Sequence, residues 1–130
     1  MSLEGVLSAS ITSRFGTDSH LRNYPVFNTA APSGTSVPYT VYQIIVSNRL
    51  HNMTLAMSWT SLQIRAVART YTDVELIAGY IDSAFDRLPL TLNSNDHVNA
   101  NILSTSSIPS YYNENLKVWE RLLTYRLFGS

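Results

Sequence analysis

A stripe of hydrophobic residues at spacings of three and four predicts a helix at the start of the chain. The stripe consists of Leu3, Val6, Leu7 and Ile11. Ser2 is placed to cap the beginning of this helix, and Gly16 to cap its end near Phe15. Residues 17–38 follow neither period and are rich in proline, glycine and small polar residues. They therefore predict a long connection with a short strand at residues 24–27.

The helical spacing returns in residues 73–88 and predicts a second helix. Its apolar positions are Val74, Ile77, Ala78, Ile81, Ala84, Phe85 and Leu88. Thr72 and Glu75 have the spacing of a capping box, in which each side chain satisfies a free N–H group of the first turn. Pro89 ends the helix because proline disfavours helical geometry in the residue before it.

Between the helices, the pattern predicts an extended hairpin. Residues 39–46 are almost entirely β-branched or aromatic, which favours a strand covered on both faces. Residues 47–53 supply the turn, and residues 54–69 then alternate between the two faces of a strand. Leu62, Ile64, Ala66 and Ala68 share one face, and Gln63, Arg65 and Arg69 share the other. At about 3.3 Å per residue the second strand would span roughly 50 Å, so we expect part of the hairpin to project.

Extended segments also close the chain. After a short extension at residues 90–92, strands are predicted at residues 98–106 and 116–128, separated by a loop at residues 108–115. The order helix, hairpin, helix, two strands predicts an α+β fold: an antiparallel sheet with a long projecting hairpin and two helices packed on one face. At this length, residues 1–130 are expected to form a single domain.

The composition narrows the classes of partner. Nine basic and nine acidic residues give a net charge of zero, so no long-range positive field recruits nucleic acid or anionic lipid. We therefore expect neither sequence-specific nucleic-acid binding nor membrane binding. Without cysteine, thiolate catalysis and disulfides are excluded. No apolar run is long enough for a membrane span and no signal-peptide pattern opens the chain, which predicts assembly in the cytoplasm.

Candidate chemistry is sparse. The three histidines are His20, His51 and His97, all in predicted loops and without the spacing of metal ligands. Asp96 beside His97 imitates half of a nucleophilic triad, but no serine lies in a strand-to-helix elbow. Asp82 and Asp86 lie one helical turn apart, as expected for a solvated outer face. We predict no catalytic, cofactor-binding or metal-binding residues.

Two features indicate assembly. Arg65 and Arg69 lie two pleats apart on the polar face of a strand, and arginine is enriched where protein surfaces meet. The alternative is that this face only meets water. The doubly apolar strand at residues 39–46 also requires more cover than two short helices on one face supply.

The order of the strand motifs resembles a known family. Pro38-Tyr39-Thr40-Val41-Tyr42-Gln43 follows a loop containing Ala31-Pro32 and Gly34, and is similar to the Pro-Tyr-x-x-Tyr strand opening of tail completion proteins of long-tailed bacteriophages. These are also called tail terminators or tail-to-head joining proteins. The likeness continues through residues 62–68, 70–73 and 123–127, and so covers most of the chain. The chain departs from the family at Arg49-Leu50-His51, where glycine or aspartate is more usual.

The resemblance implies a ring, expected to be a hexamer, that caps the tail tube, ends its polymerisation and joins it to the head connector. The implied partners are further copies of this chain, the tail tube protein and the head connector protein, at the tail-head junction of a virion. The resemblance implies no cofactor. We expect the subunit or tube interface to include Pro32, Gly34, Arg49, His51, Trp59, Gln63, Arg65 and Arg69.

Two other functions remain open at this stage. One is another head-completion or neck protein, which size and fold would not distinguish from a terminator. The other is a small α+β enzyme using Asp96 and His97. A stable monomer with a ligand-binding cleft would favour the enzyme, whereas a hexamer would favour the ring.

Overall fold

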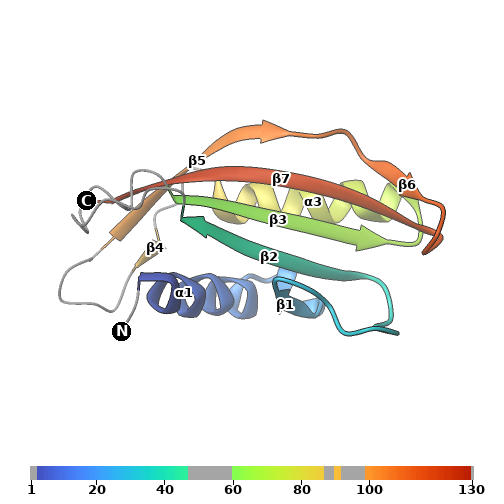
Figure 1. Cartoon of the computed structure of the whole chain (residues 1–130), viewed down its shortest axis with the longest axis horizontal. Helices are drawn as coiled ribbons and strands as arrows, with labels where there is room; N and C mark the ends of the chain where they lie inside the picture. The colour runs from blue at the N-terminus through green and yellow to red at the C-terminus, as the bar shows by residue number, and fades with distance from the viewer. Residues whose placement is uncertain (1–2, 47–59, 87–89, 92–98, 130) are drawn as a thin grey trace.

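Two helices pack on one face of a mixed sheet in the computed structural model (Figure 1). The structure describes residues 3–46, 60–86, 90–91 and 99–129. The helices are α1 (Leu3–Thr17) and α3 (Tyr71–Phe85), with a 3-10 turn η1 (Leu21–Asn23) after the first. The strands are β1 (Val26–Asn28), β2 (Tyr39–Val46), β3 (Thr60–Ala68), β4 (Leu90–Thr91), β5 (Asn99–Ser107), β6 (Tyr111–Asn113) and β7 (Val118–Gly129). The α+β class and the one-sided helices are confirmed.

The described strands form one sheet of seven, in the order β1-β2-β3-β7-β5-β4, with β6 also paired to β7. All pairs are antiparallel except β1 with β2, so the expectation of a wholly antiparallel sheet is wrong at this edge. The connection between β1 and β2 returns the chain to the end of the sheet where β1 began, so the two strands run parallel. Thr40 then donates from its backbone N and its Oγ1 to the carbonyl of Pro25, at 2.9 and 3.1 Å.

Alternation along the central strands separates a helix-covered face from the opposite one. Leu62 and Ile64 of β3 and Tyr125 of β7 are fully buried under the helices. On α3, the buried residues are Val74, Ile77, Ala78, Ile81, Ala84 and Phe85, as the periodicity predicts. The ring of Phe15 in α1 lies 5.2 Å from that of Phe85, centroid to centroid, so the two helices meet over the sheet. Leu88 lies outside the described residues.

The helix ends differ from those expected. Gly16 does not end α1, which continues to Thr17. The chain turns instead at Asp18, whose Oδ1 accepts the N–H groups of His20 and Leu21, both at 2.9 Å. Ser2, the predicted cap, lies outside the described residues.

The predicted capping box of α3 is also wrong, because the helix begins two residues earlier. Thr70 is the N-cap, and its Oγ1 accepts from the backbone N of Asp73 at 3.1 Å. Thr70 follows β3 almost directly and keeps extended backbone angles, so the first free N–H groups arise beside it rather than beside Thr72. Glu75 therefore does not cap the helix, and its side chain instead contacts Arg121 of β7.

Two strand predictions require correction. Residues 108–115, expected to be a loop, contain β6, because Tyr111–Asn113 finds a partner in β7. β2 is not covered on both faces: Tyr42 is buried against α1, but Gln43 is exposed and Ile45 is 36% exposed. The strands predicted at residues 98–106 and 116–128 are confirmed as β5 and β7. The tip of the hairpin, residues 47–59, lies outside the described residues, so its projection stays a prediction.

Candidate interaction surfaces

The face of the sheet that the described helices leave uncovered is here called the open face. On β2, β3 and β7 its described side chains include Tyr39, Val41, Gln43, Ile45, Ser61, Gln63, Arg65, Val67, Glu120, Leu122, Thr124 and Arg126. Gln63 stands in register with Gln43 on one side and with Thr124 on the other, which places a row of neutral polar groups across three strands. The predicted interface residues Gln63 and Arg65 both lie on this surface.

One buried carboxylate anchors the open face. Glu120 is only 6% exposed, and its Oε2 accepts from Nδ2 of Asn113 at 2.8 Å. Nε of Arg65 lies 3.6 Å from Oε1 of the same carboxylate. The Arg65 side chain is 48% exposed, so it also reaches the surface. The counter-charge of Arg65 therefore lies within the chain, and this surface can be covered without burying an unpaired guanidinium.

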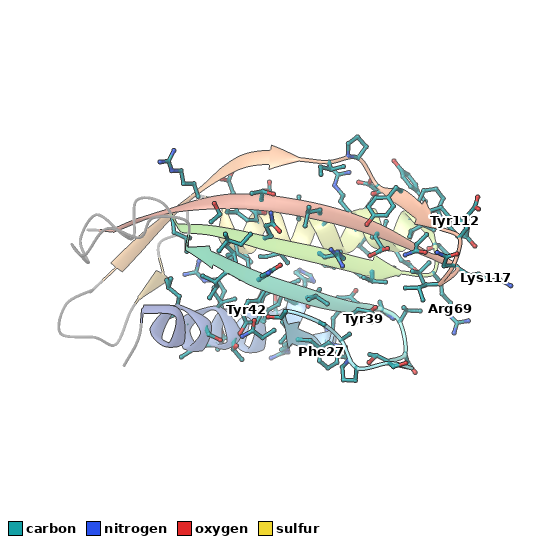
Figure 2. All side chains as sticks on the ribbon, viewed as in Figure 1. Phe27, Tyr39, Tyr42, Arg69, Tyr112 and Lys117 are labelled. Carbon is teal, nitrogen blue, oxygen red and sulfur yellow. The ribbon has the colours of Figure 1, made fainter. Side chains whose placement is uncertain are left out.

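A pocket of about 420 Å³ lies at the end of the sheet where β3 stops and β7 starts. We call it the loop pocket; it is lined by Gly34, Thr35, Ser36, Val37, Arg69, Leu116, Lys117 and Val118. Figure 2 shows Arg69 and Lys117 close together at this end. The pocket thus brings two predicted interface residues, Gly34 and Arg69, to one place. Pro32 adjoins it, because its carbonyl accepts from both the backbone N and the Oγ1 of Thr35.

Local backbone geometry shapes both walls of the loop pocket. Gly34 has φ +82°, in the left-handed region that favours glycine, although a Cβ there would meet no atom within 4 Å. Lys117 has φ 57°, and its backbone N donates to the carbonyl of Asn113 at 2.7 Å. The side chain of Asn113 accepts from the N–H groups of Asn115 and Leu116, at 3.1 and 3.2 Å. Hydrogen bonds within each wall therefore hold its shape.

An exposed aromatic cluster lies at the same end of the sheet. The rings of Tyr71 and Tyr112 meet that of Trp119 edge-on, at centroid distances of 5.2 and 5.5 Å. Tyr71 is 53% exposed and Tyr112 is 45% exposed. Tyrosine and tryptophan present large contact areas at low entropic cost, so this cluster suits a protein contact.

An ion pair ties this end to α3. Arg121 Nη1 lies 2.7 and 2.9 Å from the two carboxylate oxygens of Glu75, and Oγ of Ser110 donates to Glu75 Oε1 at 2.6 Å. The hydrogen bond from Ser110, reinforced by Arg121, lowers the pKa of Glu75 despite partial desolvation. The network fixes the segment before β6 and the start of β7 against the helix.

The remaining predicted residues divide into two groups. Arg49, His51, Trp59, Asp96 and His97 lie outside the described residues. Asp82 is exposed on α3, as expected, and also accepts from the hydroxyl of Tyr125 at 3.0 Å.

Sequence reasoning missed Glu120 and Lys117. Glu120 lies within a strand and gives no local signal, whereas Lys117 closes a turn whose asparagines are visible in the sequence.

Metal-binding and membrane-spanning features are absent from the part of the chain that the structure describes. No three His, Asp or Glu side chains there are grouped to hold a metal ion. Neither described helix has the length and apolar character needed to cross a bilayer.

The chain is similar over nearly its whole length to a chain of known structure. It is a chain described as "Virion of native gene transfer agent (GTA) particle", with a TM-score of 0.75 and 13% sequence identity. The alignment covers 98% of this chain and 97% of that chain. The two chains share a fold. No protein-family model and no curated protein sequence matches this chain.

Proposed function

We propose that the chain is a structural protein of a phage-like virion and, more specifically, a tail terminator. In this role a hexameric ring of the chain caps the tail tube, ends its polymerisation and joins it to the head connector at the tail-head junction, after assembly in the host cytoplasm. The observation that carries the proposal is the end-to-end likeness to a chain of a gene transfer agent virion, over 98% and 97% of the two chains. The Pro38–Gln43 strand opening supports the same family.

The surfaces of the chain suit a ring. A closed ring repeats one heterologous contact, so each subunit offers two different patches. The open face is one such patch, with Ile45 36% exposed among the neutral side chains of Gln43 and Gln63. The end of the sheet, with the loop pocket and the aromatic cluster, is the second. We assign one side of the subunit contact to the open face of one subunit and the other side to the end of the sheet of the next subunit.

The assembly of the purified full chain tests the ring. Sedimentation velocity with negative-stain electron microscopy is expected to show closed rings with the mass of six subunits, either alone or on addition of tail tubes. A chain that stays monomeric in both conditions contradicts the proposal.

Deletion of the gene tests the role. Loss of a terminator leaves the tube free to grow, so overlong tails without heads are expected. Tails of normal length beside heads that leak DNA would instead favour the head-completion or neck alternative.

A further inference from the structure

Two positively charged side chains, Arg69 and Lys117, line the loop pocket, and neither forms an ion pair with a carboxylate of the described residues. Arg69 lies just after β3, and Lys117 lies just before β7. Within residues 3–46, 60–86, 90–91 and 99–129, Arg65 forms an ion pair with Glu120, and Arg121 forms one with Glu75. Arg69 and Lys117 have no such partner in those residues. Two of the arginines on β3 and β7 thus meet a carboxylate of their own chain, and the pocket cations do not.

The pocket is formed before any ligand arrives. The Asn113 turn holds the wall that carries Lys117, and the bonds from Thr35 to Pro32 hold the opposite loop. Val118, which lines the pocket beside Lys117, is 7% exposed and therefore fixed in the core. A site whose walls are already ordered loses little entropy when it binds, which raises its affinity for a given set of contacts.

The chemistry of the walls selects a carboxylate. The planar guanidinium of Arg69 matches the two oxygens of a carboxylate, and Lys117 supplies a second positive charge beside it. Ser36 contributes a hydroxyl and Leu116 an apolar edge for the methylene groups of a side chain. A volume of about 420 Å³ accommodates one or two side chains of a docked segment.

We propose that the loop pocket is a carboxylate-binding site that receives a glutamate or aspartate side chain from an acidic segment of a partner protein. Nucleic acid is the poorer occupant, because the chain has nine basic and nine acidic residues and no field that would attract a phosphate backbone. Tyr112, which is 45% exposed, lies at the same end of the sheet (Figure 2) and adds aromatic surface suited to a protein. The site does not depend on the tail-terminator role, since any acidic protein partner satisfies it.

Titration of the full-length, isotope-labelled chain with defined probes tests the site. The probe is a short synthetic peptide of alternating glutamate and glycine, blocked at both ends, and the matched probe has glutamine in place of glutamate. The glutamate peptide is expected to shift the amide signals of residues 34–37 and 117–118 saturably, and the glutamine peptide is not. Equal affinity for the two peptides, or shifts confined to other regions, would overturn the proposal.

Variants test whether Arg69 and Lys117 bind the peptide. Arg69→Gln and Lys117→Gln are each expected to lower the affinity for the glutamate peptide roughly three- to tenfold, because each removes one charge-assisted contact at a partly exposed site. Arg69→Lys keeps the charge without the planar fork and should fall between the native chain and Arg69→Gln. Arg22→Gln, at an exposed position on η1, changes the net charge equally and serves as the matched control. An equal loss in Arg22→Gln would mean that only net charge matters, and would contradict the site.

Two further probes separate the sources of negative charge. Inorganic phosphate and a short oligothymidylate are titrated under the same salt conditions as the peptide. The glutamate peptide is expected to bind more tightly than either. Tighter binding of the oligonucleotide would make the site a nucleic-acid contact, and tighter binding of phosphate would remove the assignment to a carboxylate. Circular dichroism of every variant verifies that the fold is retained.

Discussion

Neighbouring residues of β3 meet two different surroundings. Leu62 and Ile64 are fully buried beneath the helices, whereas Gln63 is partly exposed on the open face and the side chain of Arg65 is 48% exposed. The same backbone thus supports one face that the helices cover and one that the chain covers only in part, since Val41 and Val67 are buried there whereas Gln43 and Arg65 reach the surface. The first face determines the fold, and the exposed part of the second is the surface proposed for assembly.

Polar groups on the two faces differ in the same way. Under the helices, the hydroxyl of Tyr125 donates to Asp82, so a buried polar group is satisfied across the interface between sheet and helix. On the open face, Glu120 takes its partners from the sheet itself, namely Asn113 and Arg65. Substitutions of buried groups should therefore lower the stability of the fold, whereas substitutions of exposed side chains on the open face should alter assembly.

The largest expected effect is on the helix-covered face. Ile81→Asp places an unpaired carboxylate at a fully buried position of α3, which should cost at least about 3 kcal/mol and remove most soluble protein. Leu76→Asp, on the same helix but 48% exposed, is the matched control and should melt close to the native chain. Soluble yield and thermal melting measure both. Similar behaviour of the two variants would show that α3 does not pack as described.

The next effect concerns Glu120, a deeply buried charge of the open face. Glu120→Ala removes the acceptor of Asn113 and the counter-charge of Arg65, and should cost about 2 kcal/mol in the free energy of unfolding. Glu114→Ala, an exposed carboxylate of the nearby turn, should change stability by less than about 0.5 kcal/mol. Urea denaturation compares the two. Equal effects would mean that Glu120 is not held by its partners.

Tyr125→Phe tests the bond between the sheet and α3. Loss of the hydroxyl should cost about 1 kcal/mol. Burial, and then the charge of Asp82, raises the pKa of Tyr125 in the folded chain, so the neutral phenol is favoured there. Its stabilisation is complete below the unfolded pKa of about 10 and is lost as the pH rises above that value. Between neutral and alkaline pH, the free energy of unfolding should therefore fall less in Tyr125→Phe than in the native chain. An equal fall in the two proteins would contradict the assignment.

Glu75→Gln tests the opposite pH direction. The pKa of Glu75 is lowered in the folded chain, so its stabilisation is present above the unfolded pKa of about 4.3 and is lost as the pH falls through the lowered value. Because the Glu75 side chain is 32% exposed, the variant should lose no more than about 1 kcal/mol at pH 7. The difference from the native chain should vanish in acid. A difference that persists there would mean that the carboxylate charge is not responsible.

Local periodicity predicted the parts of the fold in which one face is buried. The stripe on α3 and the alternation along β3 are both confirmed, because each depends only on which side of one element meets the core. The N-cap was ambiguous in the sequence, since Thr70 and Thr72 both precede an acidic residue by three positions. The residue at which β3 ends determines which threonine caps the helix. That end is set by the pairing of β3 with β2 and β7, which lie far from it in the sequence or across the hairpin.

Features that join distant segments were not predictable from the sequence. The parallel pairing of β1 with β2 involves three residues per strand, too few to leave a pattern. Arg69 was singled out from the alternation of its strand, but Lys117 enters the same pocket from a turn far along the chain. Glu120 likewise acquires its role only when β7 lies beside β3. Such contacts are set by tertiary structure, which a single sequence records only indirectly.

Sedimentation velocity of variants that introduce negative charge into the open face tests the central claim most directly. Ile45→Glu and Gln63→Glu, alone and together, lie on exposed or partly exposed strand positions and should each change the free energy of unfolding by about 1 kcal/mol or less. If the open face joins subunits, the native chain sediments as a ring and the double variant as a folded monomer with an unchanged circular dichroism spectrum. A double variant that still forms rings of the native size would contradict the account.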